Sequence, residues 1–480
     1  MKAFASLALV LASSALVAGE GSEGVSSSFA WSVGADLRIR QEFVNNVPGL
    51  PGHATSMMSS RRMAYRNQLR FRPRVWLSAE TGPFRLYARV ADEFREYPTL
   101  HTPRRERAYT FPDELFLDNL YLEGTGLSLF GLEAFDFRIG RQDMLEGHSV
   151  FGLDRLIADG TASDGSRNFY SDMARVTLHF DETKKLDLFG VYDFGRNDIR
   201  WGNHQSRGRS LNTISASDSN DLDEWGGGAI YSQTAFQGAL PFKVYAIFKA
   251  TTAHDALKPV KRRVSAREIT TFGALLNPKL SERWDFEIEA AQQAGRIVDS
   301  GEFAGGTMAH LAANYHFDTL RQYRPTLSWA TTYYSGDKDR TKEGRSDHTW
   351  DPVWGRYTQD SEMLVYGALY ENCWWANMVY SKLKFTMTFG PRHALYAYTG
   401  PMFAAVQDGL GHADNTGTFF KGILSAVRYD FPLRLAPKGA TGLDRFEVVA
   451  HVVGELFNPG GYYESDKPAY FLRWQVEFRF

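Results

Sequence analysis

Apolar and polar residues alternate along much of this chain, and the pattern is clearest over residues 470–480. Alternate side chains of a strand point to opposite sides. One side of this segment is apolar and carries Tyr470, Leu472, Trp474, Val476, Phe478 and Phe480. The other side is polar and carries Arg473, Gln475, Glu477 and Arg479. The pattern predicts a strand with one face in hydrocarbon and the other in water.

Further strands are predicted wherever the same alternation is bounded by turn residues. They cover residues 33–43, 67–77, 84–90, 135–139, 174–180, 186–192, 242–250, 284–290, 307–317, 325–333, 379–389, 423–431 and 446–452, with weaker patterns at 114–123 and 224–234. Tight connections fall at residues 79–82, 181–183, 277–280 and 390–392. Long polar connections fall near residues 45–65, 95–113, 143–171, 196–223 and 335–375. Requiring short and long connections to alternate gives about 18 strands.

This organisation predicts an all-β fold: a transmembrane antiparallel β-barrel with both termini periplasmic and long extracellular loops. A soluble propeller or sandwich also supplies many short strands. It does not readily supply the alternating connections, the aromatic strand ends and a terminal Phe480 together. In a barrel the last strand closes against the first, so no edge is left exposed. A terminal Phe after alternating aromatics also resembles the signal read by the outer-membrane assembly machinery, which predicts the cell outer membrane as the location.

The beginning of the chain resembles a secretory signal. Met1 and Lys2 give a short positive start, residues 3–17 form an apolar run, and small residues follow at Ala18 and Gly19. We predict a signal peptide over residues 1–19, a short periplasmic tether over 20–30 and a single barrel over 31–480. No later stretch approaches the roughly 18 continuous apolar residues that a membrane helix needs.

Composition agrees with a barrel. Aromatic residues make up 14% of the 480 residues and glycine is abundant, with 43 residues. The mean hydropathy is mildly negative, as expected when only every second strand residue faces lipid. The net charge of -2 does not identify a class of partner. Cys373 is the only cysteine, which excludes an intramolecular disulfide.

Once the apolar face of each strand is assigned to lipid, its other face lines the lumen. Three neighbouring strands then turn inward Arg38 and Arg40; Arg70, Arg72, Arg74 and Trp76; and Arg85, Tyr87 and Arg89. The same parity turns inward Arg138, Arg175, Lys382 and Lys384, with Asp36 and Glu42 as nearby acids. On the opposite wall Asp285, Glu287 and Glu289 form an acidic strip.

Two interpretations of these lumenal charges stand side by side. They are either the solvated, mutually paired face of any porin, or an electropositive track for anions. Arginine suits a track because its guanidinium stays charged and pairs bidentately with carboxylate or phosphate. A low-dielectric wall focuses such a field. The clustering of seven arginines on three strands favours a track, along which Tyr87 and Trp76 offer stacking faces for a sugar.

Several short motifs resemble those of the alginate-export family of outer-membrane barrels. They are Asp36-Leu37-Arg38-Ile39, Phe71-Arg72-Pro73, Phe137-Arg138-Ile139-Gly140-Arg141-Gln142, the stretch from Trp329 through Ser335-Gly336-Asp337-Lys338-Asp339, and Gly454-Glu455-Leu456-Phe457-Asn458-Pro459-Gly460. The resemblance spans nearly the whole mature chain and implies the passage of a polyuronate out of the cell.

Carried over to this chain, the resemblance implies anion contacts at Arg38, Arg72 and Arg141. Strict alternation gives Arg141 the parity of the outward Ile139, so a lumenal Arg141 requires a bulge after Gly140. The chain departs from the family at three positions where exporters carry basic residues: Asp113, Asp143 and His451.

Other chemistry is not indicated. The 12 histidines show no metal-ligand spacing, and we expect His310 and His316 to line the lumen or a turn. Ser149, His148 and Asp154 are neighbours in one loop, without the signature of a hydrolase. No basic patch with interleaved stacking aromatics indicates nucleic acid. We therefore predict no metal, no cofactor and no enzymatic activity.

The functional hypothesis is an outer-membrane channel for an anionic polysaccharide or oligosaccharide, exported in the manner of alginate. An anion-preferring porin for the uptake of small solutes is the alternative, and a barrel hydrolase is a third hypothesis. The expected partners are the polysaccharide, outer-membrane lipid, the assembly machinery acting through Phe480, and periplasmic polysaccharide-secretion proteins.

Overall fold

A computed structural model describes most of the predicted strands and part of the connections. The described residues are 29–46, 65–92, 94–96, 115–129, 132–146, 148–157, 170–193, 200–201, 223–235, 240–252, 266–338, 345–355, 361–363, 376–407, 418–433, 447–463 and 467–480. The signal peptide over residues 1–19 and most of the tether over residues 20–30 lie outside this part of the chain and stay predictions. The first strand already begins at Phe29, two residues inside the predicted tether.

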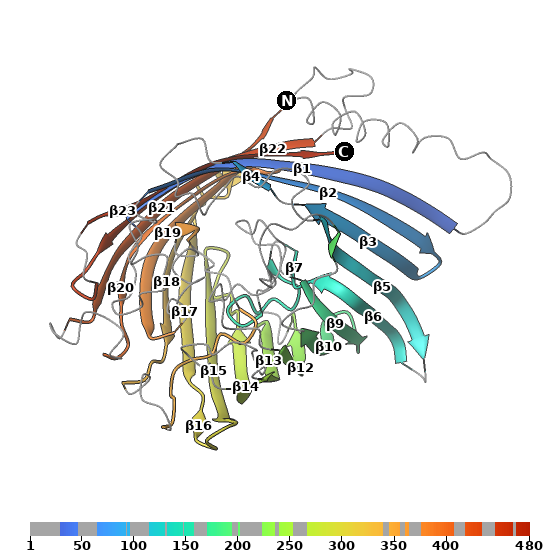
Figure 1. Ribbon diagram of the computed structural model, residues 1–480, viewed down its shortest axis with the longest axis horizontal. Coiled ribbons are helices and arrows are strands. Elements are labelled where there is room, and N and C mark those ends of the chain that lie inside the picture. The colour runs from blue at the N-terminus through green and yellow to red at the C-terminus, as the bar shows by residue number, and fades with distance from the viewer. Residues whose placement is uncertain are drawn as a thin grey trace.

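Eighteen long strands form a closed antiparallel barrel, seen along its shortest axis in Figure 1. The first nine strands are β1 (Phe29–Asn45), β2 (Tyr65–Thr81), β3 (Phe84–Asp92), β5 (Leu115–Leu129), β6 (Leu132–Asp143), β9 (Tyr170–His179), β10 (Lys184–Asp193), β12 (Asp223–Gln233) and β13 (Phe242–Thr252). The other nine are β14 (Arg267–Leu276), β15 (Trp284–Ile297), β17 (Thr307–His316), β18 (Thr326–Tyr334), β19 (Met378–Gly390), β20 (His393–Phe403), β21 (Phe420–Leu433), β22 (Glu447–Pro459) and β23 (Ala469–Arg479).

Short elements occupy some of the connections. They are β4 (Phe94–Glu96), β7 (Leu145–Glu146), β8 (His148–Ser149), β11 (Arg200–Trp201), β16 (Phe303–Ala304) and the 3-10 helix η1 (Arg321–Tyr323). Among the described residues, no helix has the length and apolar character needed to cross a membrane.

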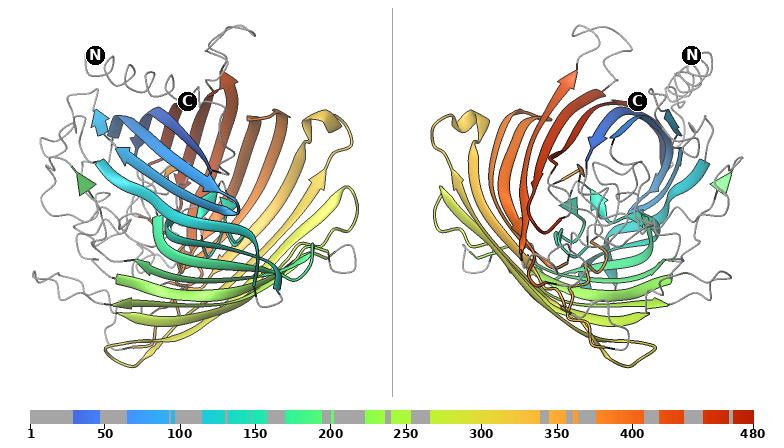
Figure 2. Two further views of the ribbon diagram at one scale, coloured as in Figure 1. Left: turned by 90° about the vertical axis from the view of Figure 1, so that its right-hand side faces the viewer. Right: turned by 60° about the vertical axis from the view of Figure 1, so that its left-hand side comes forward.

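The barrel closes where the first long strand meets the last. Strands β1 and β23 pair over ten positions, from Asp36 opposite Arg479 to Asn45 opposite Tyr470. The pairing continues beyond β23, because Phe480 donates its amide to the carbonyl of Ala35 at 2.9 Å and accepts from the Ala35 amide at 3.3 Å. Both strands therefore have a partner on each side, and the closure predicted from the sequence is confirmed. Figure 2 shows the first strands, in blue, lying beside the last strands, in red.

The strand predictions are largely confirmed, although observed strands are often longer. The weak patterns at residues 114–123 and 224–234 correspond to β5 and β12. Strands β14 and β20 were missed. In β14, Thr270 and Thr271 interrupt the alternation, and in β20 the pair Gly400-Pro401 does so. The predicted number of about 18 strands is nevertheless correct. Short and long connections have to alternate along the chain, and this requirement adds a strand at each of the two missing places.

Short and long connections lie at opposite ends of the barrel. Tight turns join β2 to β3, β9 to β10 and β19 to β20. Phe29 lies opposite Thr81, so the start of β1 is at the same end as these turns. The long connections, including those from β6 to β9 and from β18 to β19, start and finish at the other end.

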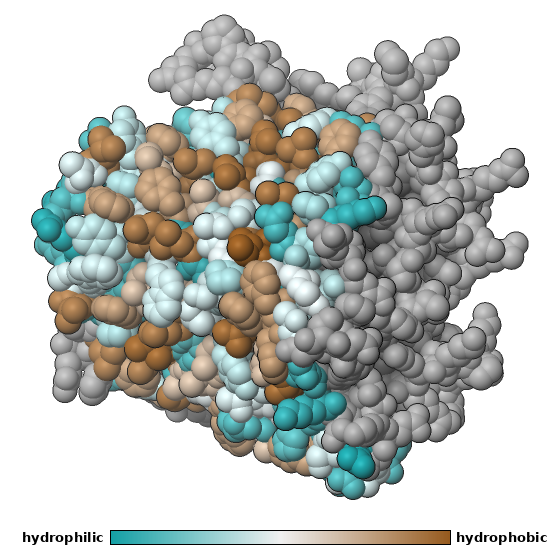
Figure 3. All heavy atoms as spheres, turned by 90° about the vertical axis from the view of Figure 1, so that its left-hand side faces the viewer, coloured by the Kyte–Doolittle hydropathy of each residue, from teal (hydrophilic) through white to brown (hydrophobic). Residues whose placement is uncertain are grey.

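The outer surface of the barrel carries exposed apolar side chains. Leu86, Ile139, Phe272, Leu383 and Val427 are examples, at 50%, 53%, 57%, 48% and 52% exposed. Figure 3 shows brown side chains distributed over one such face, with hydrophilic residues gathered mainly toward its edges. An apolar exterior around a polar interior is the arrangement that a barrel needs in a bilayer.

Candidate functional site: the lumen of the barrel

The inward faces of β1 and β2 form a basic wall. Arg38 lies opposite Arg72, and Arg40 lies opposite Arg70, in a continuous antiparallel register. All four side chains are turned away from the apolar exterior and are at most 7% exposed. The parity that the sequence predicted for them is therefore observed. Arg74 continues the row opposite Asp36.

Carboxylates partly neutralise this wall. Glu42 contacts Arg40 at 2.8 Å and Arg70 at 3.1 Å, and Asp36 contacts Arg74 at 2.6 Å. The inward positions of residues 34–42, 68–80 and 85–89 hold seven arginines and three carboxylates, which leaves an excess of four positive charges. The wall is thus paired, as in any porin, and these three strands by themselves are net positive, while Asp118 and Asp143 of the adjoining strands neutralise part of the excess at Arg89.

Trp76 follows the arginines on β2. It lies opposite Gly34, and a Cβ atom on Gly34 would come within 2.4 Å of the Trp76 ring. The glycine therefore allows the indole to lie flat over the neighbouring strand. The exposed side of this indole belongs to the same inward face as Arg74.

Strand β3 extends the basic wall toward β5 and β6. Arg85 is the more accessible of its arginines, with a side chain 37% exposed, and its guanidinium lies 5.0 Å from the centre of the Tyr87 ring. Arg89 contacts Asp118 at 2.5 Å and Asp143 at 2.6 Å. Because each arginine has acidic or aromatic neighbours on the adjacent strands, this part of the wall is a network.

Arg138 joins the same network from β6. It contacts Glu123 at 2.6 Å and lies 4.6 Å from the centre of the Tyr121 ring. Tyr121 in turn stacks on Tyr87, with ring centres 5.1 Å apart. The inward aromatic surface therefore comes from a tyrosine pair together with Trp76.

Arg141 lies beyond an irregular position in β6. Gly140 has φ +124°, and a Cβ atom there would lie 2.3 Å from the Leu120 carbonyl oxygen. Arg141 is 5% exposed and contacts Asp172 at 2.9 Å. Asp143 bonds to the inward Arg89 although it shares the parity of the outward Ile139. Strict alternation of buried and exposed side chains therefore ends near Gly140, but β6 pairs with β9 through this position without a shift of register, so the predicted bulge is not observed in that pairing.

Lys382 and Lys384 lie apart from the arginines. Both are half-buried on the inward face of β19, where Leu383 between them is exposed on the outer face. Lys382 lies 5.6 Å from the centre of the Tyr380 ring. Strands β20 to β23 separate them from β1, so the two lysines belong to a different part of the lumenal wall.

Two segments from the long connections fold into the lumen. Lys243 on β13 donates to the carbonyl oxygen of Phe151 at 2.6 Å, and Lys249 donates to that of Val353. The segments also contact each other, because Trp354 donates its amide to the carbonyl oxygen of Leu156 at 3.0 Å. We call residues 148–157 the first inward segment and residues 345–363, as far as they are described, the second inward segment.

The inward segments build an apolar core inside the barrel. Their fully buried members include Phe151, Leu153, Leu156, Ile157, Trp350, Val353, Trp354 and Met363. Phe151 packs on Phe189 of β10 with ring centres 4.6 Å apart. This core takes up lumenal space and narrows the route left for a solute.

Each inward segment places a charge against a wall of opposite sign. Arg155 of the first segment contacts Glu287 at 2.5 Å and Glu289 at 2.9 Å, in the predicted acidic strip. Its other terminal nitrogen lies 2.8 Å from Nε2 of His310, and Tyr245 donates to Glu289 at 3.1 Å. Burial alone would lower the pKa of Arg155, but the two carboxylates outweigh burial and raise this pKa above its ordinary value.

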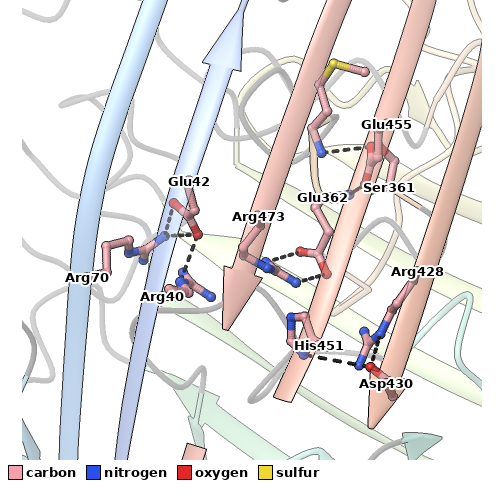
Figure 4. A network of polar contacts seen from close by, with 11 residues as sticks. Arg40, Glu42, Arg70, Ser361, Glu362, Arg428, Asp430, His451, Glu455 and Arg473 are labelled. Atoms are coloured by element: carbon pink, nitrogen blue, oxygen red, sulfur yellow. Dashed lines mark hydrogen bonds and ion pairs between the residues drawn. The ribbon is translucent and has the colours of Figure 1, made fainter. Parts of the chain in front are cut away.

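The second inward segment contacts the basic side of the lumen, as Figure 4 shows. Glu362 accepts from Arg473 of β23 through both carboxylate oxygens, at 2.6 and 2.9 Å. Ser361 donates to Glu455 of β22 at 2.6 Å. The sequence placed Arg473 on a polar strand face, but nothing in the alternation indicated that a residue more than a hundred positions away would reach it.

Ser149 and Asp154, two of the loop residues that the sequence brings close to His148, contact each other through the main chain. Asp154 accepts from the main-chain amide of Ser149 at 2.6 Å, which shapes the turn. His316, expected in the lumen or a turn, contacts Asp285 on β15. In the part of the chain that the structure describes, no three His, Cys, Asp or Glu side chains are grouped to hold a metal ion.

No protein-family profile matches the chain, and no curated protein matches it in sequence. Solved structures do match its fold. The chain is similar to OccAB1 from Acinetobacter baumannii, with 9% identity over 93% of this chain and 96% of that one and a TM-score of 0.54.

Two structures from Pseudomonas aeruginosa are similar to the same extent. OpdK, solved with vanillate, has 10% identity over 94% of this chain and 98% of that one, with a TM-score of 0.52. OccK5 (OpdH) has 10% identity over 93% and 98%, with a TM-score of 0.51. At this identity the likeness shows the fold: the chain has the antiparallel barrel fold of these proteins along nearly its whole length.

Proposed function

We propose that this protein is an outer-membrane channel that takes up small carboxylate solutes. Two features of the barrel support a membrane location. Leucine, valine and aromatic side chains are exposed on its outer surface, and β1 pairs with β23 so that the barrel is closed. Transport through such a barrel needs no bond chemistry and no cofactor.

The basic wall is the observation that carries the proposal. Its excess of positive charge lies in a narrowed lumen with low-dielectric walls, where a field is screened less than in open water. Arg38, Arg40, Arg70 and Arg72 provide several guanidinium groups within one stretch of wall. Such groups pair with carboxylates through parallel hydrogen bonds.

Two observations favour a small solute over a polymer. The apolar core of the inward segments takes up part of the lumen. One protein of similar fold, OpdK, was solved with vanillate, a small aromatic carboxylate. Export of an alginate-like polysaccharide rests on the short motifs alone, and the solved structures of similar fold give it no support. The predicted link from Phe480 to the assembly machinery remains a prediction.

The reversal potential of the purified protein in a planar bilayer tests this proposal. With a gradient of potassium chloride across the bilayer, the sign of this potential reports whether chloride or potassium permeates better. The proposal expects chloride to permeate better, and it expects benzoate to reduce the chloride current by occupying the same wall. A cation-selective channel, or a protein that forms no channel, would contradict it.

A further inference from the structure

We infer that Arg473 is a binding subsite for the carboxylate of the solute, and that Glu362 occupies this subsite until a solute arrives. The inference deepens the proposed function and rests on it. It assigns a specific carboxylate-binding residue on β23, outside the row of arginines on β1, β2 and β3. It also makes the second inward segment the competitor of the solute.

The geometry of the pair is that of a bound carboxylate. Nη1 and Nη2 of Arg473 donate to the two oxygens of Glu362, at 2.9 and 2.6 Å. The Arg473 side chain is 0% exposed, so this fork is held inside the barrel and away from solvent. A free carboxylate of a small solute would form the same two parallel hydrogen bonds.

The surroundings of Arg473 favour an anion. Glu42 of β1 lies directly opposite Arg473 in the strand register. Arg40 and Arg70 both contact Glu42, so two further guanidinium groups lie around the same corner of the lumen. Figure 4 shows these residues together, with the Glu362 carboxylate reaching in from the second inward segment. A solute entering from the end with the long connections would therefore meet Arg473 before it meets Arg38 and Arg72.

The described residues next to Glu362 are attached to the wall through one carboxylate of β22. Ser361 and the amides of Glu362 and Met363 donate to the Glu455 carboxylate, at 2.6, 2.7 and 3.2 Å. Residues 361–363 belong to no strand of the barrel wall. The contacts described between residues 361–363 and the wall therefore run through the side chains of Glu455 and Arg473.

Exchange at Arg473 couples binding to movement. An arriving carboxylate replaces one ion pair with an equivalent one, so the buried guanidinium is never left without an anion. Leaving such a charge uncompensated inside a protein is strongly unfavourable. The displaced Glu362 then turns toward water, and residues 361–363 loosen from β22 and β23. Solutes without a carboxylate offer no such exchange and leave the segment in place.

Cysteine labelling tests the movement. Met363 is 0% exposed, and Cys373 is the only native cysteine. In a Met363→Cys, Cys373→Ser protein we expect a water-soluble maleimide to react about tenfold faster in saturating benzoate than without it, because benzoate shifts the segment to its released state. Benzyl alcohol has nearly the same shape but no carboxylate, and it should leave the rate unchanged. Equal acceleration by both compounds, or by neither, would overturn the inference.

Substitution of Glu362 tests the competition. Glu362→Gln removes the competing charge, so half-maximal reduction of the current should need about tenfold less benzoate. Glu362→Asp keeps the charge on a side chain that is one methylene shorter, so its benzoate requirement should lie between those of Glu362→Gln and the unmodified protein. Glu268→Gln is the matched control, because Glu268 pairs with the exposed Arg296 away from the basic wall. An unchanged benzoate requirement in Glu362→Gln would overturn the inference.

The two proposals fail in different ways. A channel without anion preference would contradict the proposed function itself. If the channel is anion-selective but the benzoate concentration for half-maximal reduction of the current is the same in the Glu362 variants, only the assignment of Arg473 is contradicted. If the Met363→Cys barrel does not fold, as judged by its heat-dependent migration in gels, the Glu362 series decides the question alone.

Discussion

Arg155 contacts Glu289 at 2.9 Å in the interior of the barrel, where the carboxylate is 0% exposed. The arginine comes from the first inward segment and the glutamate from β15, so the pair ties a long connection to the barrel wall. It also neutralises part of the acidic strip. The positive excess on β1, β2 and β3 is therefore not opposed by a full row of bare carboxylates across the lumen.

Arg155→Gln should reduce the anion preference of the channel. The substitution uncovers Glu287 and Glu289 while changing little in volume, so the chloride-to-potassium permeability ratio should fall by roughly a factor of two or more. Reversal potentials measure the ratio. Arg296→Gln, which removes an exposed arginine paired with Glu268, is the control and should leave it unchanged.

The same substitution should also destabilise the barrel. Removing one member of a buried ion pair leaves a desolvated charge, which costs about 3 kcal/mol. The free energy of unfolding in urea, measured in lipid vesicles, should fall by about that amount. A loss below about 0.5 kcal/mol would contradict the buried pair, because surface pairs contribute that little.

Replacing Arg70, Arg72 and Arg74 together with glutamine should weaken the anion preference most. The change removes three positive charges from the wall that carries an excess of four. The reversal potential should move toward zero or toward the potassium side. Arg321→Gln removes an exposed arginine in the turn between β17 and β18 and should have no effect. If the triple variant keeps its selectivity, the basic wall does not set it.

Gly140 is predicted to be intolerant of a side chain. Gly140→Ala forces an alanine to φ +124° and brings its Cβ against the Leu120 carbonyl oxygen, so unfolding should become easier by about 1–3 kcal/mol. Gly454→Ala is the matched control, because nothing lies within 4 Å of a Cβ there. Urea titrations of both variants in vesicles compare them. Equal stability would contradict the irregular backbone of β6 at this position.

The outer face is predicted to contact hydrocarbon. Leu472 on β23 is 48% exposed, and Leu472→Arg should cost up to about 2–4 kcal/mol of unfolding free energy in vesicles, because arginine on the lipid face is unfavourable. Leu280 is 76% exposed in the turn between β14 and β15, so Leu280→Arg should cost little. Should the two substitutions have the same effect, Leu472 does not face lipid.

Much of the barrel is predictable from the sequence because alternation reports which face of a strand is apolar. Leu37 and Ile39 place Arg38 inward, and the observed register agrees. Alternation fails where both faces are mixed, as around Thr270 in β14, or where the backbone departs from regular strand geometry, as at Gly140.

The interior arrangement was less predictable. Alternation has no information on the path of a long connection, so it indicates a role for neither Arg155 nor Glu362. The pairing of Glu42 with two arginines also depends on register and side-chain reach. The sequence therefore predicted the sign of each wall, whereas the charges that the inward segments bring to those walls required the structure.

The central claim is that a net positive wall in the lumen makes this barrel an anion channel. The reversal potential of the unmodified protein across a potassium chloride gradient tests it most directly. We expect the sign that corresponds to preferential chloride permeation, weakened as ionic strength rises. A potential of the opposite sign, at low as well as high salt, would contradict the claim.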